Sequence, residues 1–261
     1  MRKTITPIIL LATLITVLLP GCEAGSLGKI VSEEKDFTNF TSVDIEGAFE
    51  VKITQAASFK TTVSADENFF DYIAVSKTDD TLRIYLNPHH TFTDFTLGAK
   101  TMKAEITMPN LRGLRLSGAT KATITGFKSP DDFNLEVSGA STLEMSGSEV
   151  GDAKFEISGA SKVTGDIKAE DTVLEISGAS KAELKGSAYD IVLNVSGASN
   201  ANLTDFILND ANVKLSGASQ ATLHIKGRLD CVVNAASSLY FLGNPTMGNV
   251  QVTGASTIKH K

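Results

Sequence analysis

Residues 171–184 read DTVLEISGASKAEL, and the tetrapeptide at their centre, Ser177-Gly178-Ala179-Ser180, recurs along the C-terminal half of the chain. Copies begin at Ser117 (with Thr120 in the last place), Ser138, Ser158, Ser177, Ser196 and Ser216, and degenerate copies begin at Asn234 and Thr253. Successive copies start 18 to 21 residues apart. A nearly fixed period of this length indicates a stack of structural repeats.

The residues on either side of each tetrapeptide alternate in polarity. If the first Ser is position zero, positions −3 and −1 are apolar, as in Leu174 and Ile176, and position −2 is mostly polar, as in Glu175. This period of two is typical of a half-buried strand, and it resumes after the tetrapeptide. Glycine is frequent at position +9, where it suits a turn. Each coil is therefore predicted to be strand, Gly-Ala-Ser bend, strand, glycine turn and short return.

Stacking the coils in parallel satisfies the strand edges, because each strand pairs with its equivalent one coil along, about 4.8 Å away. Equivalent side chains then lie directly above one another, and a narrow bend tolerates only small residues. Stacked serine hydroxyls are expected to hydrogen-bond along the column. The pattern predicts an all-β solenoid with coils of about 19–20 residues. Such short, even coils leave little room for a wide groove between loops.

Residues 36–108 fit the same template more loosely. Residues 43–53 alternate cleanly and place Gly47-Ala48 where the repeat has Gly-Ala. Further strands are expected at 81–86 and 104–108, and loops at 66–68 and 87–90. We interpret 36–108 as an irregular β segment that begins or caps the solenoid, since solenoids need atypical terminal coils to hide their open edges. Residues 109–261 carry the regular repeats, and 36–261 is expected to form one domain.

The first 21 residues are predicted to be a signal peptide. Arg2 and Lys3 precede an apolar run at 8–19 that is too short to span a bilayer. The run ends in Leu-Pro-Gly-Cys at 19–22, which resembles a lipobox, although Pro20 replaces the usual small residue. We therefore expect lipidation of Cys22, with 22–35 as a tether and the membrane as a partner through the lipid. An ordinary secretory signal with an incidental cysteine is the alternative.

Composition narrows the possible partners. The formal charge of the chain is −6, and it becomes −8 when Arg2 and Lys3 leave with the signal peptide. This argues against nucleic acid, which requires a basic face. Once Cys22 is lipidated, Cys231 has no disulfide partner, and its place at position −3 favours a small buried apolar residue. Trp is absent, which weakens any proposal of stacking on sugar rings or bases.

The repeated Ser-Gly-Ala-Ser, residues 43–55 (VDIEGAFEVKITQ) and residues 65–68 (ADEN) together resemble the auto-transporter adhesin family with a head GIN domain. The resemblance covers nearly all of 36–261. It implies a right-handed, single-stranded parallel β-helix of the pectate-lyase-like type. Members of this family are often predicted lipoproteins of Bacteroidetes-type bacteria. The family has no established catalytic residues, so none is carried over.

The clearest row of polar residues occupies position −6, at the corner that leads into the first strand of five consecutive coils: Asp132, Asp152, Asp171, Asp190 and Asp210. We expect each to form an Asx turn, in which the carboxylate accepts the backbone N–H two residues on. The alternative is a cation ladder, because stacked carboxylates repel and hard cations such as Ca²⁺ prefer oxygen ligands. The repeat lacks the glycine- and aspartate-rich nonapeptide of calcium-binding β-rolls.

The remaining polar rows carry weaker signals. Glu136, Glu156 and Glu175 at position −2 and Lys121, Lys162 and Lys181 at +4 are expected to be solvated faces with some cross-strand pairing, and a glycan-binding face is the alternative. His89-His90 is a poor metal pair, since neighbours on an extended strand point to opposite sides. His224 and His260 are isolated. No metal site or cofactor is predicted.

The sequence therefore predicts an extracytoplasmic, membrane-anchored lipoprotein that is outer-membrane, periplasmic or surface-facing, without specifying which membrane or leaflet. Its solenoid is expected to act as an adhesin that binds a glycan or a protein. A non-catalytic envelope scaffold is the first alternative. A polysaccharide-active β-helix enzyme is the second, and only fold analogy supports it. We do not expect an enzyme, because the polar residues recur coil by coil and no acid–base cluster breaks the repeat.

Overall fold

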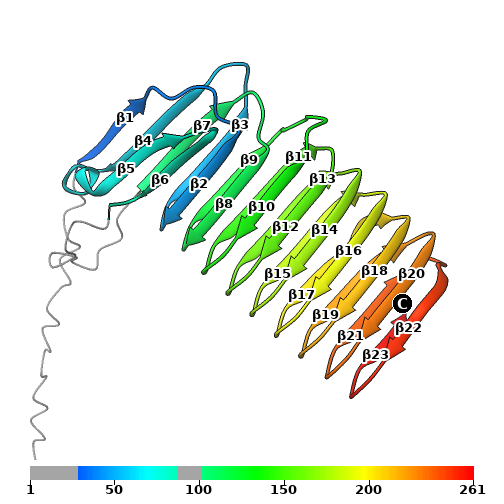
Figure 1. Cartoon of the computed structure of the whole chain (residues 1–261). Helices are drawn as coiled ribbons and strands as arrows, with labels where there is room; N and C mark the ends of the chain where they lie inside the picture. The colour runs from blue at the N-terminus through cyan, green and yellow to red at the C-terminus, as the bar shows by residue number, and fades with distance from the viewer. Residues whose placement is uncertain (1–28, 88–101) are drawn as a thin grey trace, which may run out of the picture.

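The computed structural model describes residues 29–87 and 102–261, which form a β-solenoid of about 7 turns (Figure 1). Sheet A contains, in spatial order, β1 (Ile30–Lys35), β4 (Lys60–Asp66), β7 (Met102–Met108), β3 (Glu50–Gln55), β9 (Lys121–Thr125), β11 (Thr142–Glu149), β13 (Lys162–Lys168), β15 (Lys181–Ser187), β17 (Asn200–Leu208), β19 (Gln220–Ile225), β21 (Ser238–Leu242) and β23 (Thr257–His260). Sheet B contains β5 (Ile73–Thr78), β6 (Thr81–Leu86), β2 (Ser42–Gly47), β8 (Gly113–Gly118), β10 (Phe133–Val137), β12 (Ala153–Ile157), β14 (Asp171–Ile176), β16 (Asp190–Val195), β18 (Asp210–Leu215), β20 (Arg228–Val233) and β22 (Thr246–Val252). A short 3₁₀ helix, η1 (Glu67–Tyr72), precedes β5.

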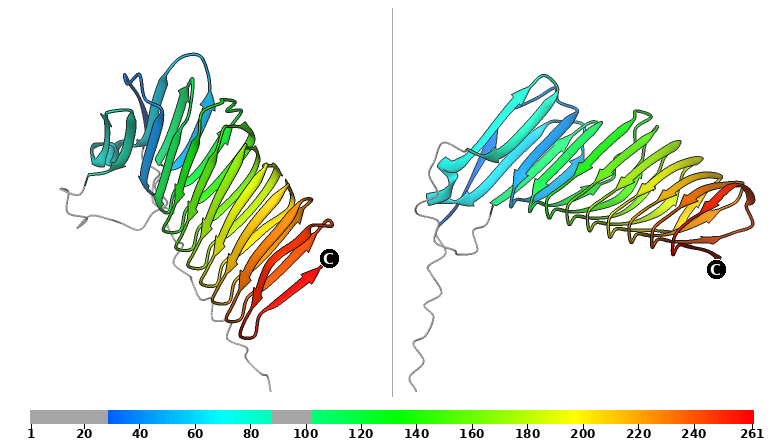
Figure 2. Two further views of the ribbon diagram at one scale, coloured as in Figure 1. Left: turned by 45° about the vertical axis from the view of Figure 1, so that its right-hand side comes forward. Right: turned by 60° about the horizontal axis from the view of Figure 1, so that its bottom comes forward.

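Each regular coil contributes one strand to each sheet. The strand before the tetrapeptide lies in sheet B, and the strand after it lies in sheet A, so the Gly-Ala-Ser bend connects the two sheets. Equivalent strands pair in parallel and in register, as in Leu174 beside Leu193 and Lys162 beside Lys181. Figure 2 shows the coils stacked side by side along one axis. This arrangement confirms the predicted solenoid.

The bend requires glycine for two reasons. The backbone φ of Gly178 is +75°, a conformation that disfavours residues with a side chain. A Cβ at Gly178 would also lie 2.4 Å from the carbonyl oxygen of Gly159 in the preceding coil. That carbonyl accepts the N–H of Ala179 at 2.8 Å, so the coils are in direct backbone contact at the bend.

The last serine of the bend is buried from Ser141 to Ser237, but its hydroxyl bonds differently from the expectation. Ser180 Oγ donates to the carbonyl oxygen of Gly159 at 3.3 Å, and Ser199 Oγ donates to that of Gly178 at 3.2 Å. Among the bends that the structure describes, a direct hydroxyl pair joins only Ser219 and Ser237. The hydroxyls of Ser141 and Ser161 have no hydrogen-bond partner in the described chain, so the predicted continuous column of hydroxyl pairs does not form.

One apolar core fills the space between the sheets and extends from Phe40 to Leu239. The inward positions −3 and −1 are almost fully buried in the regular coils, and Cys231 at 2% exposure is among them. The prediction that Cys231 is a small buried residue is therefore confirmed, and burial raises the pKa of its thiol.

The N-terminal part of the structure forms the closed end of the solenoid. Gly47 pairs with Gly118, which confirms that Gly47-Ala48 is the first bend of this type. The coil made of β6 and β7 follows later in sequence, yet it stacks on the far side of the β2–β3 coil. Beyond it, β5 pairs antiparallel with β6, and β4 and β1 add antiparallel strands to β7. These antiparallel strands cover the end.

Candidate binding surface

The aspartate column, Asp132, Asp152, Asp171, Asp190 and Asp210, follows the corner at the start of the sheet B strands. It does not form the predicted Asx turns. The Oδ1 atom of Asp171 accepts the backbone N–H of Asp190 at 3.2 Å, and Asp190 in turn accepts that of Asp210 at 3.1 Å. The prediction was wrong about the partner because in-register stacking brings the N–H of the next coil within reach of each carboxylate.

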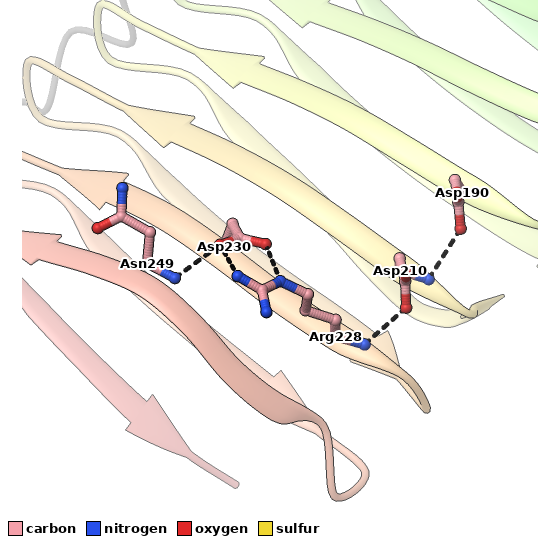
Figure 3. Close-up of polar contacts among 5 residues, drawn as sticks. All are labelled: Asp190, Asp210, Arg228, Asp230 and Asn249. Atoms are coloured by element: carbon pink, nitrogen blue, oxygen red, sulfur yellow. Dashed lines mark hydrogen bonds and ion pairs between the residues drawn. The ribbon is translucent and has the colours of Figure 1, made fainter.

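At the C-terminal end of the aspartate column, an arginine replaces the aspartate at position −6 (Figure 3). Asp210 Oδ1 accepts the N–H of Arg228, which occupies the next −6 position. The Arg228 guanidinium pairs with Asp230, and Asp230 also accepts the N–H of Asn249. The hydrogen bonds from Arg228 and Asn249 lower the pKa of the Asp230 carboxyl to about 2.

Each carboxylate of the column thus has one oxygen committed to the neighbouring coil. Within residues 29–87 and 102–261, no group of three or more His, Cys, Asp or Glu is placed to hold a metal ion. The cation ladder stays a prediction. Cys22 and the His89-His90 pair lie outside the described residues. His224 lies on sheet A, and His260 contacts the carbonyl oxygen of Gly243.

The outer face of sheet B carries ion pairs in addition to the aspartate column, both across neighbouring strands and within one strand. Arg115 lies 3.2 Å from Glu136, and Lys154 lies 2.6 Å from Glu156. Near the closed end, Arg83 contacts Asp44. Burial raises the pKa of the Asp44 carboxyl, and the positive charge of Arg83 offsets part of this rise. The predicted cross-strand pairing therefore exists for Glu136, whereas Glu156 pairs within its own strand and Glu175 makes no ion pair within the described chain.

The outer face of sheet A is hollowed over the strands from β7 to β15. A depression of about 1050 Å³ lies over β7, β3, β9 and β11, and a second of about 500 Å³ continues over β11, β13 and β15. The two depressions share Thr123 and Glu144, and we refer to them together as the trough. The even coil length had argued against a groove between loops. The trough instead lies on the strands themselves, across the coils.

Charged side chains line the trough in equal numbers. Five are lysines (Lys52, Lys103, Lys121, Lys162 and Lys185), and five are acids (Glu50, Glu105, Glu144, Asp166 and Glu183). Lys103 and Glu50 form an ion pair at 3.0 Å in which both side chains remain exposed. Two of the three predicted lysines at position +4, Lys121 and Lys162, line the trough. Lys181 lies beside Lys162 and pairs with Glu183 at 3.5 Å. The trough therefore combines donors and acceptors with no net charge.

Comparisons with known proteins identify the fold. Residues 39–245 match the family model described as "Putative auto-transporter adhesin, head GIN domain". A crystal structure described as a "putative adhesin" from Parabacteroides merdae superposes with a TM-score of 0.79 at 16% identity, covering 90% of this chain and 97% of that chain. A "putative adhesin" from Parabacteroides distasonis gives 0.77 at 16% identity, covering 90% and 98%.

A third structure, described as a "putative lipid binding protein" from Parabacteroides distasonis, gives a TM-score of 0.68 at 14% identity and covers 90% of this chain and 97% of that chain. At these identities the likeness shows the fold alone. No curated protein matches the sequence.

Proposed function

Because this chain belongs to the "putative auto-transporter adhesin, head GIN domain" family, we propose that its adhesin-like β-solenoid is a non-catalytic binding module of the cell envelope. The family and two of the three similar structures described above carry the names of adhesins, and none of them carries the name of an enzyme. In this proposal the trough on sheet A holds the ligand, and the aspartate column of sheet B joins neighbouring coils.

The observation that carries this proposal is the shape of the trough. It runs over β7, β3, β9, β11, β13 and β15, and so crosses successive coils instead of closing around a small molecule. Such a surface suits an extended chain that lies across the strands. Repeated coils offer similar groups at each step of about 4.8 Å, so a polymer can make the same contacts several times.

The charge of the trough indicates the ligand class. Five lysines and five acids cancel, so neither a polyanion nor a polycation gains from long-range attraction. A neutral glycan offers hydroxyl groups that donate to carboxylates and accept from ammonium groups. Hydrogen bonds to charged groups are the stronger kind, with a net contribution of about 1.5–3 kcal/mol each. We therefore propose a neutral glycan as the ligand.

Lipidation of Cys22 places this module at a membrane in our proposal. The leader and the lipobox-like residues 19–22 support it. In the described part of the chain, no helix has the length and hydropathy needed to cross a bilayer. One similar structure is described as lipid binding, but the trough of this chain is lined by charged groups, so lipid serves here only as the anchor.

A glycan panel tests the ligand. The full chain in detergent is incubated with immobilised neutral and charged glycans, and both retention and released products are measured. We expect retention of neutral glycans without products. A double variant in the trough, Lys121→Ala with Glu144→Ala, should reduce retention by at least about tenfold, which corresponds to about 1.4 kcal/mol.

The matched control is Lys154→Ala with Glu156→Ala, which removes one lysine and one glutamate from sheet B, outside the trough. It should leave retention unchanged. Equal losses in both double variants would contradict the trough as the site. Released oligosaccharides would favour an enzyme, and the absence of both retention and products would favour an envelope scaffold.

A further inference from the structure

Exposed apolar side chains gather on two coils in the middle of sheet B. Tyr189, one residue before β16, is 67% exposed, and Val192 on the outer face of β16 is 42% exposed. Val173 of β14 lies in register with Val192 and is half-buried. The other large exposed apolar side chains of the described chain lie on β1 and β22, which are edge strands. We call Tyr189, Val173 and Val192 the apolar patch.

The apolar patch departs from the repeat. Val173 and Val192 occupy position −4, and the neighbouring coils have polar residues there: Asn134, Lys154 and Asn212. Tyr189 occupies position −7, where the neighbouring coils have Asp131, Gly151, Glu170 and Asn209. Those coils stack equally well without an apolar side chain at these outward positions. The solenoid therefore does not require the apolar patch, and a binding role explains why the repeat is broken here.

Carboxylates surround the apolar patch. The segments 170–177 and 189–196, which include β14 and β16, contain no lysine or arginine and four acids: Glu170, Asp171, Glu175 and Asp190. Neither Glu170 nor Glu175 forms an ion pair in the part of the chain that the structure describes. The flanking strands carry one lysine each, Lys154 on β12 and Lys214 on β18, and Lys154 already pairs with Glu156. Unlike the trough, this surface has an excess of negative charge.

The acids are placed where they repel one another. Asp171 lies in register with Asp190, and Glu156 lies in register with Glu175. Like charges opposite each other on neighbouring strands destabilise a sheet. Asp171 and Asp190 each accept a backbone N–H from the next coil, whereas no such bond holds Glu175. A positively charged partner would therefore relieve repulsion without displacing an ion pair of Glu175.

The rows of side chains on this surface match an extended segment. On β14 the outward side chains are Asp171, Val173 and Glu175, so an apolar side chain lies between two acids. Alternate residues of an extended chain face the same way, about 6.6 Å apart. A segment in which every second residue reads base, apolar, base can thus place each side chain over its counterpart. At the corner, the N–H of Tyr189 donates to the carbonyl oxygen of Glu170 at 2.6 Å, so the tyrosine stands beside a further acid.

We propose that this surface binds a basic segment of another protein, in which an apolar side chain lies between two lysines or arginines. The apolar side chain packs on Val173 and Val192, and the bases pair with the flanking carboxylates. The exposed ring of Tyr189 offers its face to a further cation. Nucleic acids and anionic lipids are repelled here. The surface lies on sheet B, so the proposal does not rest on the trough or on its ligand.

A designed peptide tests the class of partner. The probe is the fluorescently labelled peptide Lys-Ser-Val-Ser-Lys-Ser-Val-Ser-Lys, and its anisotropy is measured with the full chain in detergent. We expect binding that weakens as salt is added, because salt screens exposed charges. Replacing each Lys of the peptide by Glu, or each Val by Ser, should weaken binding by at least about tenfold. No binding of the original peptide up to about 1 mM, or equal binding of the Glu peptide, would overturn the inference.

Variants of the chain test the location. Tyr189→Ser combined with Val192→Thr should weaken peptide binding by at least about tenfold. Both side chains are exposed, so the melting temperature should not change. The control Ile30→Thr removes an exposed apolar side chain of β1, away from the apolar patch, and should leave binding unchanged. A double variant that binds the peptide as the parent does would contradict the proposal. Glycan retention should be the same in all these variants, because the trough lies on sheet A.

Glu175 distinguishes a binding role from a structural one. Glu175→Gln should weaken peptide binding roughly twofold to fivefold, the range for an exposed ion pair. It should also raise the melting temperature, because it removes repulsion from Glu156. The control Glu67→Gln on η1 changes the net charge equally, away from the apolar patch, and should alter neither quantity. A lower melting temperature with unchanged peptide affinity would assign Glu175 to the fold alone and count against the proposal.

Discussion

At the residue scale, the bend glycine shows how one backbone position constrains the repeat. Gly178 and Gly126 have nearly the same positive φ, +75° and +78°. They differ in surroundings, because a Cβ at Gly178 would meet the backbone of Gly159 at 2.4 Å, whereas a Cβ at Gly126 would meet nothing within 4 Å. Substitutions at these two glycines therefore distinguish the cost of backbone strain from the cost of a steric clash between coils.

We expect Gly178→Val to destabilise the protein by roughly 3 kcal/mol or more, since strain and steric clash add. The control Gly126→Val should cost about 1–2 kcal/mol from strain alone. Chemical denaturation measures both values. An unchanged stability of the Gly178 variant would refute the tight bend.

Ala235 provides the opposite substitution. It occupies the glycine position of the degenerate copy, Asn-Ala-Ala-Ser, and its φ is +63°. We expect Ala235→Gly to stabilise the protein by about 1 kcal/mol, because removing the Cβ relieves this strain. A gain in melting temperature confirms the expectation, and a loss would mean that the methyl group contributes more by packing than it costs in strain.

Asp230 predicts a pH effect. Its pKa in the folded protein is about 2, below the value of about 3.9 for an unfolded chain. The ionised carboxylate therefore stabilises the fold above about pH 4, and this contribution is lost as the pH falls toward 2. We expect Asp230→Asn to lower the melting temperature at pH 7 and to have little effect at pH 2. A difference that is constant across this range would contradict the assignment.

At the element scale, the aspartate column links successive strands of sheet B through carboxylate-to-backbone hydrogen bonds. Asp171→Asn keeps an acceptor for the N–H of Asp190 and removes one charge from a row of like charges. We expect it to leave stability unchanged or to raise it slightly. Asp171→Ala removes the acceptor and should cost about 1 kcal/mol.

Calcium distinguishes this structural role from the cation ladder. If the column acts only within the fold, millimolar Ca²⁺ should not change the melting temperature of either the parent or the Asp171→Asn variant. A calcium-dependent rise in the parent that Asp171→Asn abolishes would establish the ladder as a cation site.

At the scale of the whole molecule, the proposed lipid anchor at Cys22 attaches the solenoid to the membrane by its N-terminal end. We expect Cys22→Ser to move the protein from the membrane fraction to the soluble fraction, because no acyl chains would then attach. Fractionation of cells followed by immunoblotting measures this change. A variant that stays in the membrane fraction would refute the lipobox interpretation.

The sequence by itself determined the repeat and the pattern of each coil. Leu174 and Ile176 alternate with Glu175, so a strand with one buried face follows from period two. The tetrapeptide that contains Gly178 recurs every 18 to 21 residues, so each coil stacks on the coil before it. Local patterning is enough here, because parallel stacking makes every coil bury the same positions that its neighbours bury.

Only the tertiary structure decided which edges meet. The alternation in β6 and β7 predicts strands, but it does not specify that they stack outside β2 and β3, since either edge of that coil offers the same hydrogen bonds. The bond from Asp171 to Asp190, the trough on sheet A and the pairing of Val173 with Val192 all depend on the positions of neighbouring coils. Distances between coils are absent from the pattern of any single coil, so these features emerge only when the coils are stacked.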